Sequence, residues 1–161
     1  MLLPRIDTTL FILNPPFGIT GIDLKIGDPF RGAPRALEAV PGAAGVRTLP
    51  GSGACHAYVE SLDLGLAVHR DKTGSVDALE VYGPGFGGTV EFRGIDVFSV
   101  PADDLIDRLS RDFSSTTEDS GLFFLIPDLL LSFSRASLPA EEGGDYGFYF
   151  ESVLVAAPGY Y

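Results

Sequence analysis

The sequence predicts an α+β fold in which a unit of one strand, one helix and three further strands occurs twice. The first observation is a repeated phrase, because Gly21-Ile22-Asp23-Leu24 returns almost unchanged as Gly94-Ile95-Asp96-Val97. The second is the content of 20 Gly and 12 Pro, which implies many turns and favours a strand-rich fold over a helical bundle. The third is an apolar stripe at helical spacing in the second half, formed by Leu105, Ile106, Leu109 and Phe113.

Two further phrases repeat in the same order along the chain. Residues 62–70 match residues 127–135, and residues 79–85 match residues 154–159. Matches in one order and at similar spacing indicate an internal repeat. The sequence therefore predicts a tandem duplication.

The length of 161 residues suits one domain. We expect residues 1–161 to form a single domain built from two pseudo-repeats, 1–85 and 86–161, with the glycine-rich residues 83–88 as the seam. The predicted architecture is one curved antiparallel sheet with two helices on one face. The alternative is a sandwich or barrel to which the helices are peripheral.

The first half opens with β-forming residues at 8–13 and a turn with two prolines at 14–18. Apolar residues then alternate over 19–26, which predicts a strand with one buried face. A helix is expected over 28–40, where Pro34 shortens or distorts it. The Gly, Ala and Pro residues of 41–53 predict a loop. Three strands follow, at 55–60, 64–70 and 75–82.

The second half repeats this order. A strand is expected over 89–98, a helix with acidic residues in its first turn over 101–113, and a polar loop over 114–120. The last three strands are expected at 122–126, 129–135 and 146–156.

Charge is unevenly distributed. The formal net charge is −11. Residues 1–85 hold nine acidic and seven basic residues, a balance of −2, whereas residues 86–161 hold thirteen and four, a balance of −9. An acidic surface repels nucleic-acid phosphate, so no nucleic-acid partner is expected. It suits a basic protein partner, although excess acid that only maintains solubility is the simpler alternative.

Hydropathy and cysteine content bear on location. No apolar run approaches the roughly 18 residues of a membrane span, and the N-terminus lacks the order of a secretory signal, so we expect no membrane partner and a cytoplasmic protein. A chain whose signal has been removed is the alternative.

Cys55 is the only cysteine, which excludes an intrachain disulfide and a cage of cysteines around a metal. We expect neither metal nor cofactor.

The strongest catalytic candidates are Cys55, His56 and His69, the only thiol and the only imidazoles of the chain. Cys55 and His56 are adjacent on a predicted strand and should point to opposite faces, whereas Cys55 and His69 could meet across two strands as a nucleophile and its base. We expect a buried, inert Cys55 and a non-enzymatic protein. The alternative is a small-ligand binder or an enzyme that uses the sheet cleft near these three residues.

Other motifs have structural interpretations. Ser52 lies between glycines without the spacing of a nucleophile elbow. Asp71, Thr73, Ser75 and Asp77 alternate oxygen ligands, but the glycine position does not fit a calcium loop, so a hairpin turn is predicted. Asp23 and Asp96 in the repeated phrase are expected to accept backbone hydrogen bonds rather than to act as paired acid and base.

Aromatic residues beside acidic loops are typical of protein interfaces, with charge for steering. The expected interface combines the acidic second helix, the acidic loop after it and the aromatic last strand. A homodimer through an exposed sheet face is a further alternative. The predicted partner-binding residues are Asp103, Asp104, Asp107, Glu141, Glu142, Asp145, Tyr146 and Tyr149.

Two phrases of the second half, from Gly94 to Asp104 and from Phe150 to Tyr161, are informative. In these phrases the second half resembles small bacterial immunity-type proteins that accompany secreted toxins. It implies a protein that neutralises a basic toxin or enzyme by binding it. In layout alone, the tandem unit is similar to the duplicated helix-on-sheet inhibitors of β-lactamase, a likeness of fold that does not imply function.

Overall fold

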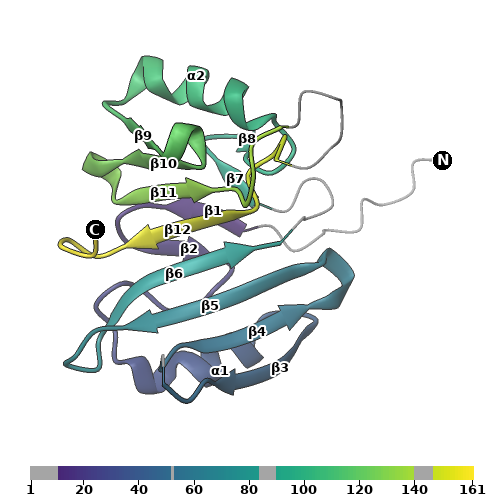
Figure 1. Cartoon of the computed structure of the whole chain (residues 1–161). Helices are drawn as coiled ribbons and strands as arrows, with labels where there is room; N and C mark the ends of the chain where they lie inside the picture. Colours follow the sequence, from purple (N-terminus) through teal and green to yellow (C-terminus); the bar gives the residue numbers. More distant parts are fainter. Residues whose placement is uncertain (1–10, 52, 84–89, 140–146) are drawn as a thin grey trace.

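An eight-stranded antiparallel sheet forms the centre of the protein (Figure 1). The computed structural model describes residues 11–51, 53–83, 90–139 and 147–161. In spatial order the strands are β3 (Ala43–Thr48), β4 (Cys55–Val59), β5 (Leu64–Arg70), β6 (Val76–Tyr82), β12 (Ser152–Ala156), β11 (Leu131–Ser134), β10 (Phe123–Ile126) and β9 (Thr116–Glu118).

A second sheet has the order β2-β1-β7-β8, with β1 (Phe11–Asn14), β2 (Gly18–Thr20), β7 (Val90–Phe92) and β8 (Ile95–Asp96). Its β1–β7 pair is parallel and its other pairs are antiparallel. The sequence did not predict this sheet. The predicted α+β class is confirmed, with two α-helices and mostly antiparallel strands.

The two strands predicted around the repeated phrase are wrong. Residues 19–26 form only β2 and then a series of turns, because Gly21 takes a positive φ of 107° that ends the strand. Within the strand predicted over 89–98, residues 90–96 form the hairpin of β7 and β8, because Arg93 and Gly94 both take positive φ, at 51° and 79°. Ile22 and Leu24 are still buried, so their alternation reflects core packing.

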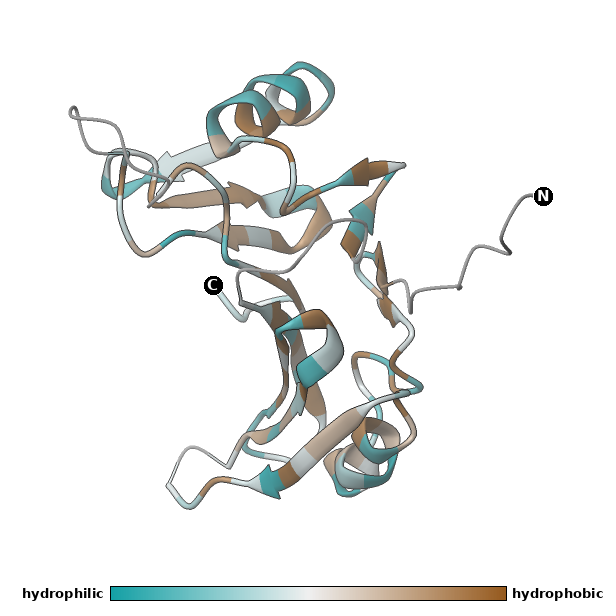
Figure 2. Cartoon of the chain, turned by 90° about the vertical axis from the view of Figure 1, so that its right-hand side faces the viewer, coloured by the Kyte–Doolittle hydropathy of each residue, from teal (hydrophilic) through white to brown (hydrophobic). Residues whose placement is uncertain are grey.

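Two helices cover opposite ends of the large sheet. A 3₁₀ turn, η1 (Phe30–Gly32), leads into α1 (Ala33–Glu38), which buries Leu37 against β3 and β4. Pro34 lies in the first turn of α1, where its missing N–H leaves no hydrogen bond unmade. The second helix, α2 (Ala102–Asp112), lies near β9 (Figure 1). Figure 2 shows apolar and polar residues alternating along it, as the sequence predicts.

Both predicted loops contain an edge strand, and one predicted strand is shorter than expected. β3 and β9 lie within 41–53 and 114–120; their side chains are mostly exposed, so no apolar alternation marked them. In the described part of the strand predicted over 146–156, β12 begins only at Ser152, since Gly147 takes a φ of 77° and the following residues turn before the ladder begins. The remaining connections carry the 3₁₀ turns η2 (Glu60–Leu62), η3 (Asp119–Gly121) and η4 (Pro127–Leu129).

The core lies on one face of the large sheet. Two rows of paired residues cross it from β4 to β10 at matching register, and their side chains are buried or nearly so. One row is Ala57, Leu66, Val81, Val153, Phe133 and Phe124, and the other is Cys55, Val68, Leu79, Val155, Leu131 and Ile126. Apolar residues of both helices and of the four-stranded sheet belong to the same core.

Arg135 is a buried charge that joins three segments. Its side chain is 2% exposed and donates hydrogen bonds to the carbonyl oxygens of Gly121 (3.0 Å) and Gly147 (2.9 Å). Its third contact is an ion pair of 2.9 Å with Asp103 at the start of α2. Arg135 thereby anchors α2 and the segment before β12 to the end of β11.

No helix in the described ranges is long and apolar enough to cross a membrane.

We predict that Arg135→Met lowers the free energy of unfolding by about 2–4 kcal/mol, because two buried carbonyl groups lose their donor. Asp103→Asn should cost less than about 1 kcal/mol, since the Asp103 side chain is 73% exposed. Urea unfolding of both variants measures the difference. Equal losses of unfolding free energy in the two variants would show that the ion pair, and not the hydrogen bonds to the carbonyl groups, stabilises this contact.

Candidate functional site

The second face of the eight-stranded sheet bears a mixture of polar and aromatic side chains. Side chains alternate along a strand, so residues between the core positions point away from the core. We call this the outer face. Its central row of paired residues is Arg47, His56, Ala67, Glu80, Leu154, Ser132 and Leu125.

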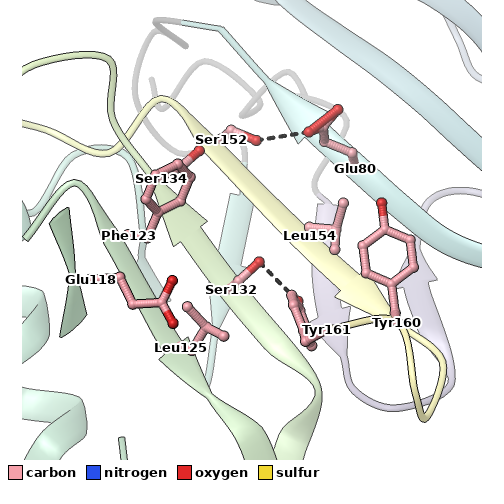
Figure 3. Close-up of a pocket in the computed structure, with 10 residues that line it drawn as sticks. All are labelled: Glu80, Glu118, Phe123, Leu125, Ser132, Ser134, Ser152, Leu154, Tyr160 and Tyr161. Atoms are coloured by element: carbon pink, nitrogen blue, oxygen red, sulfur yellow. Dashed lines mark hydrogen bonds between the residues drawn. The ribbon is translucent and has the colours of Figure 1, made fainter. Parts of the chain in front are cut away.

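A depression of about 410 Å³ lies on the outer face over β6, β12, β11, β10 and β9. Figure 3 shows its lining, which combines the carboxylates of Glu80 and Glu118 with the rings of Phe123, Tyr160 and Tyr161. We call it the acidic pocket. The three rings are 39–52% exposed, so the pocket offers aromatic surface together with negative charge.

Hydrogen bonds fix two sides of the acidic pocket. The Tyr161 hydroxyl donates to Ser132 Oγ at 2.8 Å, which holds the residues after β12 against β11 (Figure 3). The Ser152 hydroxyl donates to Glu80 Oε2 at 3.1 Å, while Glu80 Oε1 lies 3.7 Å from His69 Nε2. Burial acts to raise the pKa of Glu80, but the neighbouring His69 and the Ser152 hydrogen bond outweigh it and lower the pKa. Glu80 is therefore a carboxylate at neutral pH.

The two histidines meet on the outer face. Their ring centroids are 6.5 Å apart with the planes at 76°, and His56 Nδ1 lies 3.2 Å from the Tyr82 hydroxyl. Burial lowers the pKa of His56, and the positive influence of His69 and Arg47 lowers it further against the opposing effect of Glu80. His56 is thus held neutral at physiological pH.

Tyr82 lies flat across the sheet because its partner on β5 has no side chain. Gly65 pairs with Tyr82, and a Cβ built on Gly65 would lie 2.2 Å from the tyrosine ring. A glycine beneath an aromatic ring on the neighbouring strand lets the ring cover the backbone. Gly65 is therefore what allows Tyr82 to reach His56.

Cys55 does not join the histidines. It points into the core from β4 and is fully buried, whereas His56 and His69 lie on the outer face. Burial raises the pKa of the Cys55 thiol, which disfavours the nucleophilic thiolate. The hypothesis of a Cys55–His69 pair is wrong because the sheet separates the two side chains.

The predicted partner-binding residues fall into three groups. Asp104, Asp107 and Tyr149 are exposed, while Asp103 is engaged by Arg135. None of these four lines the acidic pocket. The expectation that the aromatic residues at 148–150 lie on the last strand is wrong, since Phe148 and Tyr149 are exposed on a turn and Phe150 is buried ahead of β12. The others, Glu141, Glu142, Asp145 and Tyr146, lie outside the described residues.

The hairpin interpretation of the loop after β5 is confirmed. Asp71 Oδ1 accepts hydrogen bonds from the backbone N–H and the hydroxyl of Thr73 and from the Ser75 N–H, at 2.8, 2.6 and 3.1 Å. These bonds, with that of the Thr73 hydroxyl first, lower the pKa of Asp71. Within the described parts of the chain, no three His, Cys, Asp or Glu side chains gather as metal ligands.

Sequence reasoning missed Glu80, Glu118, Tyr160 and Tyr161. Glu80 had a detectable signal, because it is an acid between the apolar residues Leu79 and Val81 of a predicted strand. Glu118 had none, since its short strand reads as a polar loop.

We predict that Gly65→Ala lowers the free energy of unfolding by about 1–3 kcal/mol, because the new methyl group displaces the Tyr82 ring. The same substitution in a Tyr82→Ala background should cost much less, since the obstructing ring is gone. A double-mutant cycle by urea unfolding measures the coupling. An equal cost in both backgrounds would locate the strain elsewhere.

We also predict that Cys55 resists Ellman's reagent in the native protein and reacts fully once urea unfolds the chain, because the thiol is buried and its pKa is raised. The release of thionitrobenzoate measures the reaction. Fast native labelling would contradict a core position.

In comparisons with known proteins, no family model, curated protein or solved structure matches this chain. The function must therefore be inferred from the chemistry of the outer face.

Proposed function

We propose that the chain is a non-enzymatic protein-binding module, immunity-like or inhibitor-like, that binds a basic protein partner such as a toxin or another enzyme. The observation that carries the proposal is the acidic pocket, where Glu80 and Glu118 stand among exposed aromatic rings on the outer face (Figure 3). Aromatic side chains anchor interfaces and acids select a partner of opposite charge. A lysine or arginine that enters the pocket would meet both.

The roles of the two carboxylates differ. Glu80 is partly buried and already holds Ser152, so it supplies a fixed negative charge at the base of the pocket. Glu118 is exposed on the edge strand β9 and is available to a partner. Charge that is fixed before binding costs less reorganisation on association. The pocket therefore offers one prearranged and one adaptable acid.

The acidic residues of α2 support the same proposal at longer range. Asp104 and Asp107 are exposed on the helix that lies near β9 (Figure 1), and the net charge of the chain is −11. Exposed charges outside a contact accelerate encounter more than they tighten the complex. Asp103 is a poor probe of this role because it also anchors Arg135.

The proposed architecture is a tandem duplication of pseudo-repeats 1–85 and 86–161. The sheet order supports it, because each half supplies four strands in mirrored sequence around the β6–β12 pair. The turn between β4 and β5 and the turn between β10 and β11 support it too. In each, a 3₁₀ turn is followed by a residue with left-handed backbone, Asp63 in the first and Leu130 in the second.

We propose a cytoplasmic location, which fits the single, unpaired Cys55.

The test begins with capture of proteins from the native host on the purified chain, identification of the captured protein by mass and titration of that purified partner by calorimetry. We expect Glu118→Lys to weaken binding at least tenfold and Phe123→Ala by about 10–100-fold, the range of an interface hot spot. Affinity should fall as salt concentration rises.

Glu38→Lys is the matched control, because it makes the same change in charge at an exposed position of α1. It should weaken binding much less than Glu118→Lys. If the two charge reversals weaken binding equally, the net charge of the chain, and not the acidic pocket, determines the affinity. Affinity that is constant across the salt series and in both variants would overturn the proposal, as would turnover of the captured partner.

A further inference from the structure

A second depression, of about 320 Å³, lies on the outer face over β3, β4 and β6. Its polar lining is formed by Arg47, His56, Tyr58 and Tyr82, and we call it the basic pocket. Leu49 and Ala44 add apolar surface, and Gly45 and Ala57 complete the lining. The acidic pocket and the basic pocket therefore lie on one face of one sheet, on opposite sides of its central strands.

The two edge strands of the large sheet carry opposite charges beside the two pockets. Arg47 on the edge strand β3 pairs with His56 of β4. At the other edge, Glu118 of β9 pairs with Phe123 of β10. Each pocket is thus bounded by one charged residue from an edge strand and one ring from the strand beside it.

Arg47 is exposed, and no carboxylate of the described residues lies within ion-pairing distance of it. Its guanidinium can offer two parallel donors to an anion.

The remaining polar groups supply one more donor and no second permanent charge. When the Tyr82 hydroxyl donates to His56 Nδ1, the neutral imidazole carries its proton on Nε2 and can donate to a ligand. Burial and the nearby Arg47 both disfavour a protonated His56. Tyr58 donates to Asp63, so its ring forms a wall and its hydroxyl is already used.

We propose that the basic pocket binds a carboxylate carried on an apolar or aromatic body. One permanent cation and a neutral donor match a monoanion, whereas a phosphate dianion would keep an uncompensated charge. The tyrosine rings and Leu49 provide the surface for the apolar body. This site does not depend on the proposed binding of a basic partner, because the residues of the two pockets do not overlap.

The test follows the two histidine Cε1–H signals of the full chain by nuclear magnetic resonance at constant ionic strength, with His69→Gln to assign them. Sodium benzoate should shift the His56 signal saturably, with a dissociation constant on the order of 1–10 mM. The pKa of His56 should rise when benzoate is bound, because an anion stabilises the imidazolium. Nα-acetyl-phenylalanine, with its free carboxylate, tests whether a peptide C-terminus is preferred over a free small acid.

Three comparisons decide the outcome. Benzamide, the neutral analogue, should cause no saturable shift, and Arg47→Met should weaken benzoate at least tenfold while the amide spectrum stays native. Arg108→Met, at an exposed arginine of α2, should leave benzoate binding unchanged. The proposal is overturned by equal shifts with benzamide, by equal benzoate affinity in the Arg47→Met variant, by inorganic phosphate binding as tightly as benzoate, or by no shift at all.

Discussion

The pairing of β6 with β12 is the interaction on which the rest of the structure depends. Five residue pairs, from Ser152 with Tyr82 to Ala156 with Ala78, join strands that the chain places far apart in sequence. Through this ladder the two rows of core residues cross the whole sheet without interruption, so Leu66 and Phe133 belong to one apolar layer. Without it, each half would present an open edge and a core cut in two.

The same ladder creates the outer face. Because side chains alternate, a continuous core on one side requires a continuous row on the other, and Glu80 and Ser152 meet there across the junction. The central strands carry the hydrogen-bonded groups, while the edge strands carry Arg47 and Glu118 with their charges exposed. The face therefore runs from positive at β3 to negative at β9, a direction that could orient a partner as well as attract it.

The sequence predicted the strands and the helix in which the spacing of apolar residues indicates a buried face. The bounds of β5 are those expected, β4 and β6 agree to within one residue, and α2 follows from its apolar stripe. The edge strands β3 and β9 were missed because exposed strands need no apolar alternation. The four-stranded sheet was missed because Gly21 ends β2 after three residues, and Arg93 and Gly94 turn the chain between β7 and β8. Of the site, strand parity predicted that His56 faces away from Cys55, but the face of His69 depends on the register between β4 and β5. The acidic pocket was not predictable, since its residues come from five strands and the residues after β12.

The shape of the two edge strands has a consequence for how copies of the chain can associate. An exposed strand edge is a template on which further strands can add, and a sheet with two open ends could in principle grow into a polymer. β9 has only three residues, and the pairing of β3 with β4 is interrupted by a bulge between Ala44 and Arg47, where Gly45 takes a φ of 65°. A short edge at one end and an irregular edge at the other both hinder regular strand addition. The two ends of the sheet thus hinder edge-to-edge growth of the chain into a filament.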